Sequence, residues 1–248
     1  MMKVVFLLLL VNVFIVASTI NIAVAANVSY AIDTLKKEFS KFHPHVKVNI
    51  TLGSSGKLTA QIKNGAPFDV FMSANMKYPQ ALYDAKMTIT KPKLYAQGSL
   101  AIFSKKERDF SHVINMLKSK EIKRIAVANP KTAPYGIATK EALKNAKVYD
   151  ELESKFIYGE SISQTVSYTL TAVDVGLIAK SSLYSSKMKK YKKGLNWSEI
   201  DSKLYSPIDQ GIVLLSKAKN SSDAKAFYDF ILSQDAKKIF ISFGYLVK

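Results

Sequence analysis

The sequence predicts an α/β protein in which mainly parallel sheets are covered by helices on both faces. Short apolar runs of strand length alternate with amphipathic helical segments along almost the whole chain, which is typical of parallel sheets. The 248 residues suffice for one large domain or two small ones with a properly buried core. There is no internal repeat and no low-complexity linker, so strands must cross between the lobes if the chain forms two.

The first part of the alternation starts directly after an apolar N-terminal segment. We expect, in order, strand 20–25, helix 30–42, strand 46–52, helix 57–64, strand 69–72 and helix 76–85. The stripe Ile32, Leu35, Phe39 and Phe42 gives the first of these helices an apolar face. Gly65 stands where a glycine commonly ends a helix, directly after the second one.

A second set of elements begins at residue 99. We expect strands at 99–103, 124–128, 155–158, 175–178 and 211–216, and helices at 111–119, 136–146, 162–171, 224–232 and 236–243.

Residues 1–18 have the features of a secretory signal. Lys3 supplies the positive start, and Val4–Val16 is an apolar run of 13 residues interrupted only by Asn12. The run is short for a membrane span. Small residues allow cleavage after Ser18 or after Ala25, and we predict Ser18 because cleavage after Ala25 would remove the first strand. No cysteine lies near either point, so we expect no lipid anchor.

The composition points to an anionic partner. The formal net charge is +17, which suits nucleic acid, a membrane surface or a small anion. Lysines are scattered over nearly every segment, and the one dense run, at 187–193, is interpreted as a solvated helix end or loop, so we expect no nucleic-acid partner. The absence of cysteine excludes disulfides, a thiolate zinc site and a cysteine nucleophile.

Four turns between a strand and a helix share one chemical character. They are Ala26–Ser29, Gly53–Gly56, Ala133–Gly136 and Glu160–Ser163. Ligands of open α/β sheets bind beyond the carboxyl ends of the strands, where helix N-termini offer free N–H groups and a partial positive charge. Hydroxyls and side-chain amides add neutral donors that suit a small oxyanion. Serine and asparagine are also ordinary helix N-caps, so the turns by themselves leave the ligand open.

Several segments resemble the periplasmic molybdate- and tungstate-binding proteins of ABC transporters. The segments are 25–29, 53–58, 61–74 (QIKNGAPFDVFMSA), 126–130 with 133–136, and the ending 226–230. The Gly-Ala-Pro-Phe-Asp-Val-Phe stretch with its preceding serine turn is the most specific. The resemblance implies a two-lobed type II periplasmic-binding-protein fold, with crossing strands as the hinge and the anion in the cleft. The lobes are expected at 19–98 plus 211–248 and at 99–210.

The resemblance also implies a set of ligand-binding residues. Asn27 and Ser55 would donate from side chain and backbone, and Tyr135 and Ile162 from their backbone N–H groups. Ala26, Ser54 and Ala179 are secondary candidates. Some members carry a tyrosine hydroxyl at the position of Ala179, so one donor is missing here or is supplied elsewhere. The metal enters only as the oxyanion, and no cofactor is expected.

The expected protein is a monomeric receptor that serves an ABC permease with its ATPase. A soluble receptor needs an outer membrane to retain it, which indicates a Gram-negative periplasm. A receptor for another tetrahedral oxyanion, such as sulfate or phosphate, remains an alternative. A secreted hydrolase is a remote one, because no Gly-x-Ser-x-Gly elbow stands at the serine turn and His112 is the only histidine far along the chain. His43-Pro44-His45 is interpreted as a turn, since no acidic cluster accompanies it.

Overall fold

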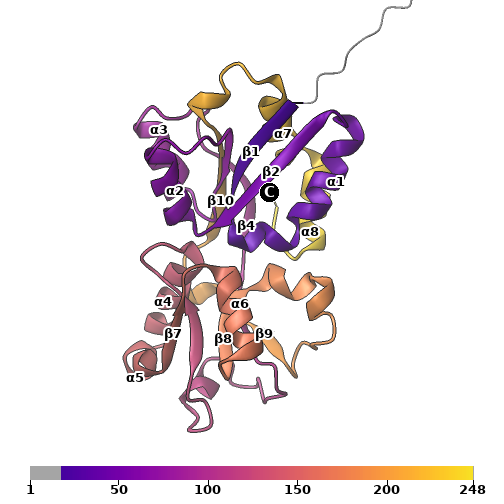
Figure 1. Cartoon of the computed structure of the whole chain (residues 1–248). Helices are drawn as coiled ribbons and strands as arrows, with labels where there is room; N and C mark the ends of the chain where they lie inside the picture. The colour runs from indigo at the N-terminus through magenta and orange to yellow at the C-terminus, as the bar shows by residue number, and fades with distance from the viewer. Residues whose placement is uncertain (1–17, 248) are drawn as a thin grey trace, which may run out of the picture.

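The computed structural model describes residues 18–247, and these form two lobes stacked along the long axis of the molecule (Figure 1). Each lobe is built on one five-stranded sheet, and the predicted two-lobed α/β fold is confirmed. Most of the predicted secretory signal, residues 1–17, lies outside the described residues.

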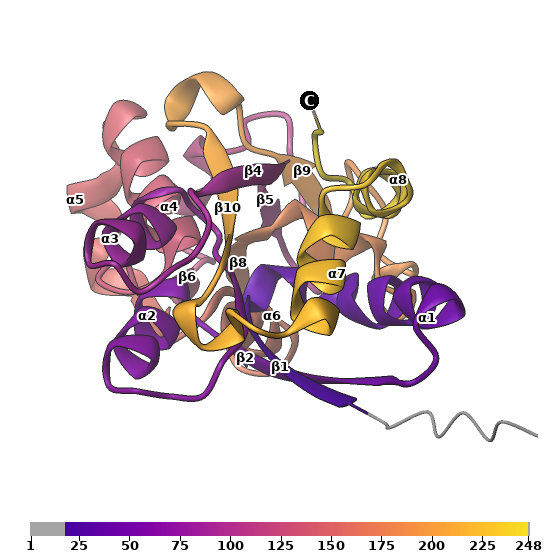
Figure 2. The ribbon, with the colours of Figure 1, turned by 90° about the horizontal axis from the view of Figure 1, so that it is seen from above.

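The sheet of the first lobe has the strand order β2-β1-β3-β10-β4. Its strands are β1 (Ser18–Ala25), β2 (Val46–Gly53), β3 (Val70–Met72), β4 (Lys93–Gly98) and β10 (Ile208–Leu214). Four of them run in one direction, and β10 runs antiparallel to both of its neighbours. Figure 2 shows α2 (Ser55–Lys63) and α3 (Lys77–Asp84) on one side of this sheet, and α1 (Ile32–Phe42), α7 (Ser222–Ile231) and α8 (Gln234–Ser242) on the other.

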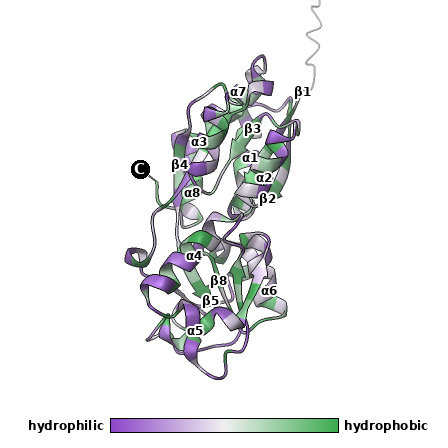
Figure 3. Cartoon of the chain, turned by 90° about the vertical axis from the view of Figure 1, so that its left-hand side faces the viewer, coloured by the Kyte–Doolittle hydropathy of each residue, from purple (hydrophilic) through white to green (hydrophobic). Residues whose placement is uncertain are grey.

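The second lobe repeats this plan with the strand order β7-β6-β8-β5-β9. Its strands are β5 (Leu100–Phe103), β6 (Ile125–Ala128), β7 (Phe156–Gly159), β8 (Val175–Ala179) and β9 (Trp197–Glu199). Here β5 is the reversed strand. The helices α4 (Pro134–Asn145) and α6 (Ile162–Thr171) flank the sheet (Figure 3), and the short α5 (Tyr149–Leu152) packs against α4.

The chain passes between the lobes twice. It leaves the first sheet at Gly98 and enters the second at Leu100, and it returns from β9 to β10, whose first residue Ile208 pairs with Gly98. The first sheet therefore draws on 18–98 and 208–214, and the second on 100–199. The lobe limits 19–98 plus 211–248 and 99–210 stay a prediction.

Apolar clusters hold the helices of each lobe against its sheet, and the cluster of the second lobe extends into the first. Leu35 and Phe39 of α1 pack with Phe227 of α7 and Phe240 of α8 in the first lobe. Figure 3 shows the apolar strands inside and the polar residues on the outward helix faces, as expected for sheets covered on both sides. In the part of the chain that the structure describes, no helix is long and apolar enough to cross a membrane.

One helix predicted from the local sequence is wrong, and the strands β4 and β9 were not predicted. The helix expected at 111–119 is wrong, because that region forms turns and a short 3₁₀ helix, Asn115–Lys118. Its start is diverted by Asp109, whose carboxylate accepts the N–H of Ser111 at 2.8 Å and so favours a turn over a helix. Strand β4 was not predicted, and its ladder is made with β10, more than 100 positions further along the chain.

Candidate functional site

The residues that the sequence singles out meet where the two lobes touch. Ala26 from the first lobe and Tyr135, Ile162 and Ala179 from the second belong to one buried cluster. Ala74 of the first lobe lies in the same cluster, and its N–H donates to the Ser55 hydroxyl at 2.9 Å. Asn27 and Ser55 are fully buried. The predicted set is therefore gathered at one place between the lobes.

Three polar contacts join the two lobes around these residues. The N–H of Gly56 donates to the carbonyl of Thr132 at 2.9 Å, and the Ser181 hydroxyl donates to the carbonyl of Asn27 at 3.1 Å. Lys57 pairs with Glu160 at 3.1 Å, although both side chains are mostly exposed. The first two contacts are direct hydrogen bonds from predicted binding turns of the first lobe, 53–56 and 26–29, to residues of the second lobe that lie next to Ala133 and shortly after Ala179.

Helix starts supply backbone donors to the site. Ser55 is the first residue of α2 and Ile162 the first of α6, while Tyr135 follows Pro134 at the start of α4. The first N–H groups of a helix have no acceptor within the helix. Within residues 18–247, no backbone carbonyl accepts a hydrogen bond from the N–H groups of Ser55, Tyr135 and Ile162. They provide three unengaged donors at the positive ends of three helix dipoles.

The serine turn adds hydroxyl donors. Because the Ser55 hydroxyl already accepts from Ala74, its own hydrogen remains free to donate. Ser54 occupies the N-cap position of α2 but makes no capping bond, and its buried hydroxyl has no partner in the described part of the chain. Ser161 is an ordinary helix N-cap, because its hydroxyl accepts the N–H of Gln164, whereas Ser54 caps no N–H group of its helix.

Asn27 lies in a 3₁₀ helix, Ala26–Tyr30, and not at the start of an α-helix as the sequence suggested. Its Nδ2 donates to Gln210 at 2.9 Å and to the Tyr245 hydroxyl at 3.0 Å. Its Oδ1 is buried without a hydrogen-bond partner among the described residues. The Asn27 side chain is therefore tied to the crossing strand β10 and to the C-terminal segment.

Sequence reasoning missed Gln210 and the tyrosines around it. The fully buried Gln210 accepts from Tyr95 at 2.7 Å and donates to the Tyr135 hydroxyl at 3.3 Å. The only signal was an amide directly before the apolar run Gly211–Leu214, in a strand where a buried polar side chain needs partners.

Burial keeps these phenols protonated. It raises the pKa of Tyr245 to about 12, and it raises the pKa values of Tyr95 and Tyr135 well above the usual 10.0. Each hydroxyl can therefore both donate and accept across the neutral pH range.

No cationic side chain is buried at the site. Asp69 is the one ionisable acid or base among the buried polar residues that the structure describes. It accepts the N–H of Asn21 at 2.7 Å and precedes β3, whereas the site lies beyond the other end of that strand. Ala179, at the end of β8, contributes no side-chain donor, as the sequence predicts. The site is thus built from neutral dipoles.

A polar cavity of about 190 Å³ adjoins the serine turn between the lobes. The first lobe contributes Ser54, Lys57 and Gln61 to its lining, and the second lobe Glu160, Ser161 and Gln164. Since Lys57 and Glu160 form the ion pair across its wall, this cavity continues the same interlobe region.

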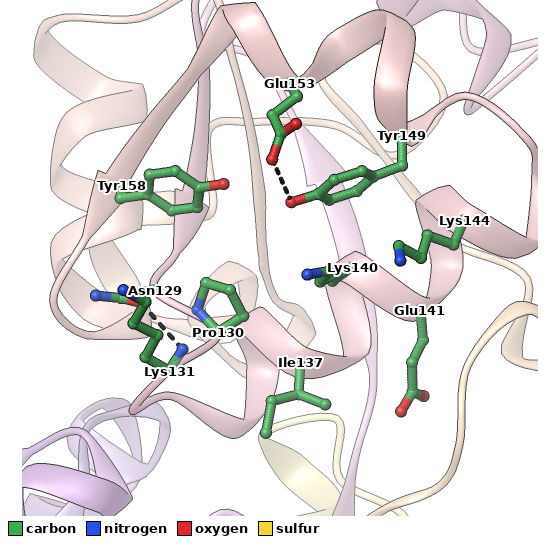
Figure 4. A pocket seen from close by; sticks show the side chains of 10 residues that line it. All are labelled: Asn129, Pro130, Lys131, Ile137, Lys140, Glu141, Lys144, Tyr149, Glu153 and Tyr158. Atoms are coloured by element: carbon green, nitrogen blue, oxygen red, sulfur yellow. Dashed lines mark hydrogen bonds between the residues drawn. The ribbon is translucent and has the colours of Figure 1, made fainter.

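A separate, wider hollow of about 660 Å³ lies on the second lobe, beside α4 (Figure 4). Lys140 and Lys144 stand 5.3 and 5.7 Å from the centre of the Tyr149 ring, and the Tyr149 hydroxyl donates to Glu153 at 3.1 Å. None of the predicted site residues lines this hollow.

Two lobes joined by crossing strands, with a buried polar site between them, define a solute receptor that holds its ligand by closing. The chain belongs to the family described as bacterial extracellular solute-binding proteins, which it matches over residues 20–246. This confirms the family that the resemblance of the sequence segments predicted.

Individual members of this family are similar to the chain over most of their length. The chain is 33% identical to the molybdate-binding protein ModA of Azotobacter vinelandii over 231 residues, covering 92% of this chain and 90% of that protein. It is 32% identical to ModA of Rhodobacter capsulatus, covering 94% and 90%. The solved structure of the Azotobacter vinelandii periplasmic molybdate-binding protein superimposes with a TM-score of 0.84 and 28% identity, covering 92% of this chain and 99% of that one.

Proposed function

We propose that this protein is an extracytoplasmic receptor that binds molybdate or tungstate between its lobes and delivers it to an ABC permease. The observation that carries the proposal is the meeting of three helix starts, the Ser55 hydroxyl and Asn27 at one buried place without a cationic side chain. The similarity to two molybdate-binding proteins along almost their whole length supports the same ligand.

Neutral donors suffice to hold a dianion when each oxygen receives hydrogen bonds. The backbone N–H groups of Ser55, Tyr135 and Ile162 and the Ser55 hydroxyl supply such bonds, with the Asn27 amide as a further donor. The Ala26 N–H belongs to the same region. The buried and unpaired Ser54 hydroxyl is our candidate for the donor missing at Ala179.

The absence of a buried carboxylate at the described site favours a fully deprotonated ligand. Hydrogen phosphate carries a proton that needs an acceptor, whereas molybdate carries none at neutral pH. Asp69 is held at the opposite end of β3 and is already engaged with Asn21. This argument favours molybdate and tungstate over phosphate.

Closing of the lobes follows from where the donors come from. Asn27 and Ser55 belong to the first lobe, and Tyr135 and Ile162 to the second, so an anion that touches all four bridges the lobes. Such a ligand binds the closed state better and shifts the population toward it. The closed shape is then what the permease, which works with an ATPase, recognises.

The remaining features of the proposal concern the setting. The protein acts as a monomer in the periplasm, is exported by the signal at residues 1–18 and carries no lipid anchor. It performs no catalysis and needs no cofactor, in keeping with a family of binding proteins.

Titration calorimetry with molybdate, tungstate, sulfate and phosphate at one ionic strength tests the proposal. We expect molybdate and tungstate to bind far more tightly than the other two anions. Tighter binding of sulfate or phosphate would assign the receptor to another tetrahedral oxyanion. A folded protein that binds none of the four would remove the oxyanion site altogether.

A further inference from the structure

The Asn27 side chain leaves an acceptor, and not a donor, without a hydrogen-bond partner. Both hydrogens of its Nδ2 are used by Gln210 and Tyr245, and the atom left without a partner is the acceptor Oδ1. A buried, unpaired carbonyl oxygen is costly, and beside a bound dianion it would repel the ligand. For the Asn27 side chain to donate to the ligand, as the proposed function expects, the amide has to turn over.

Reversal of Asn27 alone is blocked by Gln210. It would bring Oδ1 to the place of Nδ2, 2.9 Å from Gln210 Oε1, where two acceptors would face each other. That oxygen also accepts from Tyr95 at 2.7 Å, so it is held in place from a second direction. The orientation of Asn27 is therefore controlled by the orientation of Gln210.

Reversal of both amides together gives every acceptor and hydroxyl of this network a partner and leaves only the hydrogens of Asn27 Nδ2 unpaired. Gln210 Nε2 then donates to Asn27 Oδ1 and to the Tyr95 hydroxyl, which turns its own hydrogen to the carbonyl of Ser73, 3.3 Å away. On the other side the Tyr135 hydroxyl changes from accepting to donating toward Gln210. These exchanges need only rotation of hydroxyls that burial keeps protonated.

Tyr245 completes the exchange. Its hydroxyl donates to the Asn27 carbonyl at 2.9 Å, and it can turn to Asn27 Oδ1 because Ser181 also donates to that carbonyl, at 3.1 Å. After the reversal Asn27 Nδ2 occupies the former place of Oδ1 with its hydrogens free. No heavy atom outside the two amides has to move.

We propose that Gln210 is a positioning residue that sets, by reversing together with Asn27, which end of the Asn27 amide faces the bound oxyanion. This inference rests on the proposed function. Gln210 itself does not touch the anion. Its place in β10, which pairs with Gly98 at the point where the chain crosses between the lobes, links the donor to the hinge. A Cβ at Gly98 would lie 2.0 Å from the Tyr135 hydroxyl and 2.7 Å from Gln210 Nε2, so this network is packed directly onto the crossing point.

A double-mutant cycle in the full protein tests this with molybdate as the probe. Asn27→Ala and Gln210→Met should each weaken molybdate binding by about 10- to 150-fold, the effect of one lost hydrogen bond to a charged group. If Gln210 acts through Asn27, the double variant binds no more weakly than Asn27→Ala alone. Losses that multiply in the double variant, or wild-type affinity in Gln210→Met, would overturn the proposal.

A second measurement needs no substitution at Gln210. In ¹⁵N-labelled wild-type protein, the side-chain amide signals of Asn27 and Gln210 should both move when molybdate is added. Gln97 is the matched control, because its amide donates to Asp209 at 2.7 Å, outside this network. A shift of Asn27 with an unchanged Gln210 would refute the coupled reversal. Wild-type protein that fails to bind molybdate at all would instead refute the proposed function.

Discussion

Replacement of Ser55 by alanine removes two interactions that the structure separates. We propose that the hydroxyl donates its hydrogen to the ligand, while its oxygen accepts the Ala74 N–H at 2.9 Å. The first role concerns the ligand and the second the fold. Ser55→Ala should therefore change both the affinity for molybdate and the thermal stability, by amounts that can be estimated independently.

The loss of a hydrogen bond to a charged ligand costs about 1.5–3 kcal/mol, which raises the dissociation constant by about 10- to 150-fold. The buried Ala74 N–H is left without its acceptor, which costs about 1–3 kcal/mol of folding free energy. In a chain of this size each kcal/mol lowers Tm by about 2–4 °C, so a decrease of about 2–12 °C is expected in the absence of ligand.

Calorimetric titration and thermal unfolding of one preparation measure the two effects. Ser104→Ala is the matched control, because Ser104 is also fully buried and its hydroxyl accepts from Arg108 at 3.0 Å. It follows the end of β5 that lies away from Leu100, the partner of Ala179, and so it should affect stability without affecting affinity. Folded Ser55→Ala protein with wild-type affinity, or an equal loss of affinity in Ser104→Ala, would refute the assignment of Ser55 as a ligand donor.

Four further outcomes are expected. Gly98→Ala should lower both Tm and the affinity for molybdate, because the added Cβ would lie 2.0 Å from the Tyr135 hydroxyl. Thermal unfolding and calorimetric titration measure the two effects, and wild-type values of both would contradict this prediction. Burial raises the pKa of Tyr245 to about 12, so the contribution of the protonated Tyr245 to stability is complete below about pH 10 and is lost as the pH rises through 12. Tyrosinate absorbance should therefore appear together with unfolding between pH 10 and pH 12. Ionisation of all tyrosines at pH 10 in folded protein would contradict this. Higher ionic strength should slow the association of molybdate, since surface fields are screened over about 8–10 Å, while the ratio of molybdate to sulfate affinity stays constant. Stopped-flow mixing measures the association rate, and equilibrium titration measures the affinity ratio. A ratio that decreases strongly with salt would show that surface lysines select the anion. Mass spectrometry of exported protein should find Thr19 as the first residue, because a chain beginning at Ala26 would lack all of β1, the strand between β2 and β3.

The sequence by itself determined the features that depend on neighbouring residues. The helix 162–171 was predicted with the bounds that the structure shows, because Ser161 caps it and its apolar residues recur at helical spacing. The serine turn before α2 and the Pro134 start of α4 also carry their local geometry in their residue types. Since these turns hold the backbone donors, most of the candidate site was predictable as a set of positions.

Only the tertiary structure decided how distant segments combine. Strand β4 and the reversed direction of β10 depend on pairing across more than 100 positions, which local periodicity does not encode. The partners of Asn27 lie 183 and 218 positions away, in the crossing strand and near the C-terminus, and neither segment resembles a binding motif. The physical reason is that the orientation of a buried amide is set by whichever donors and acceptors the fold brings against it, and these come from both sides of the hinge.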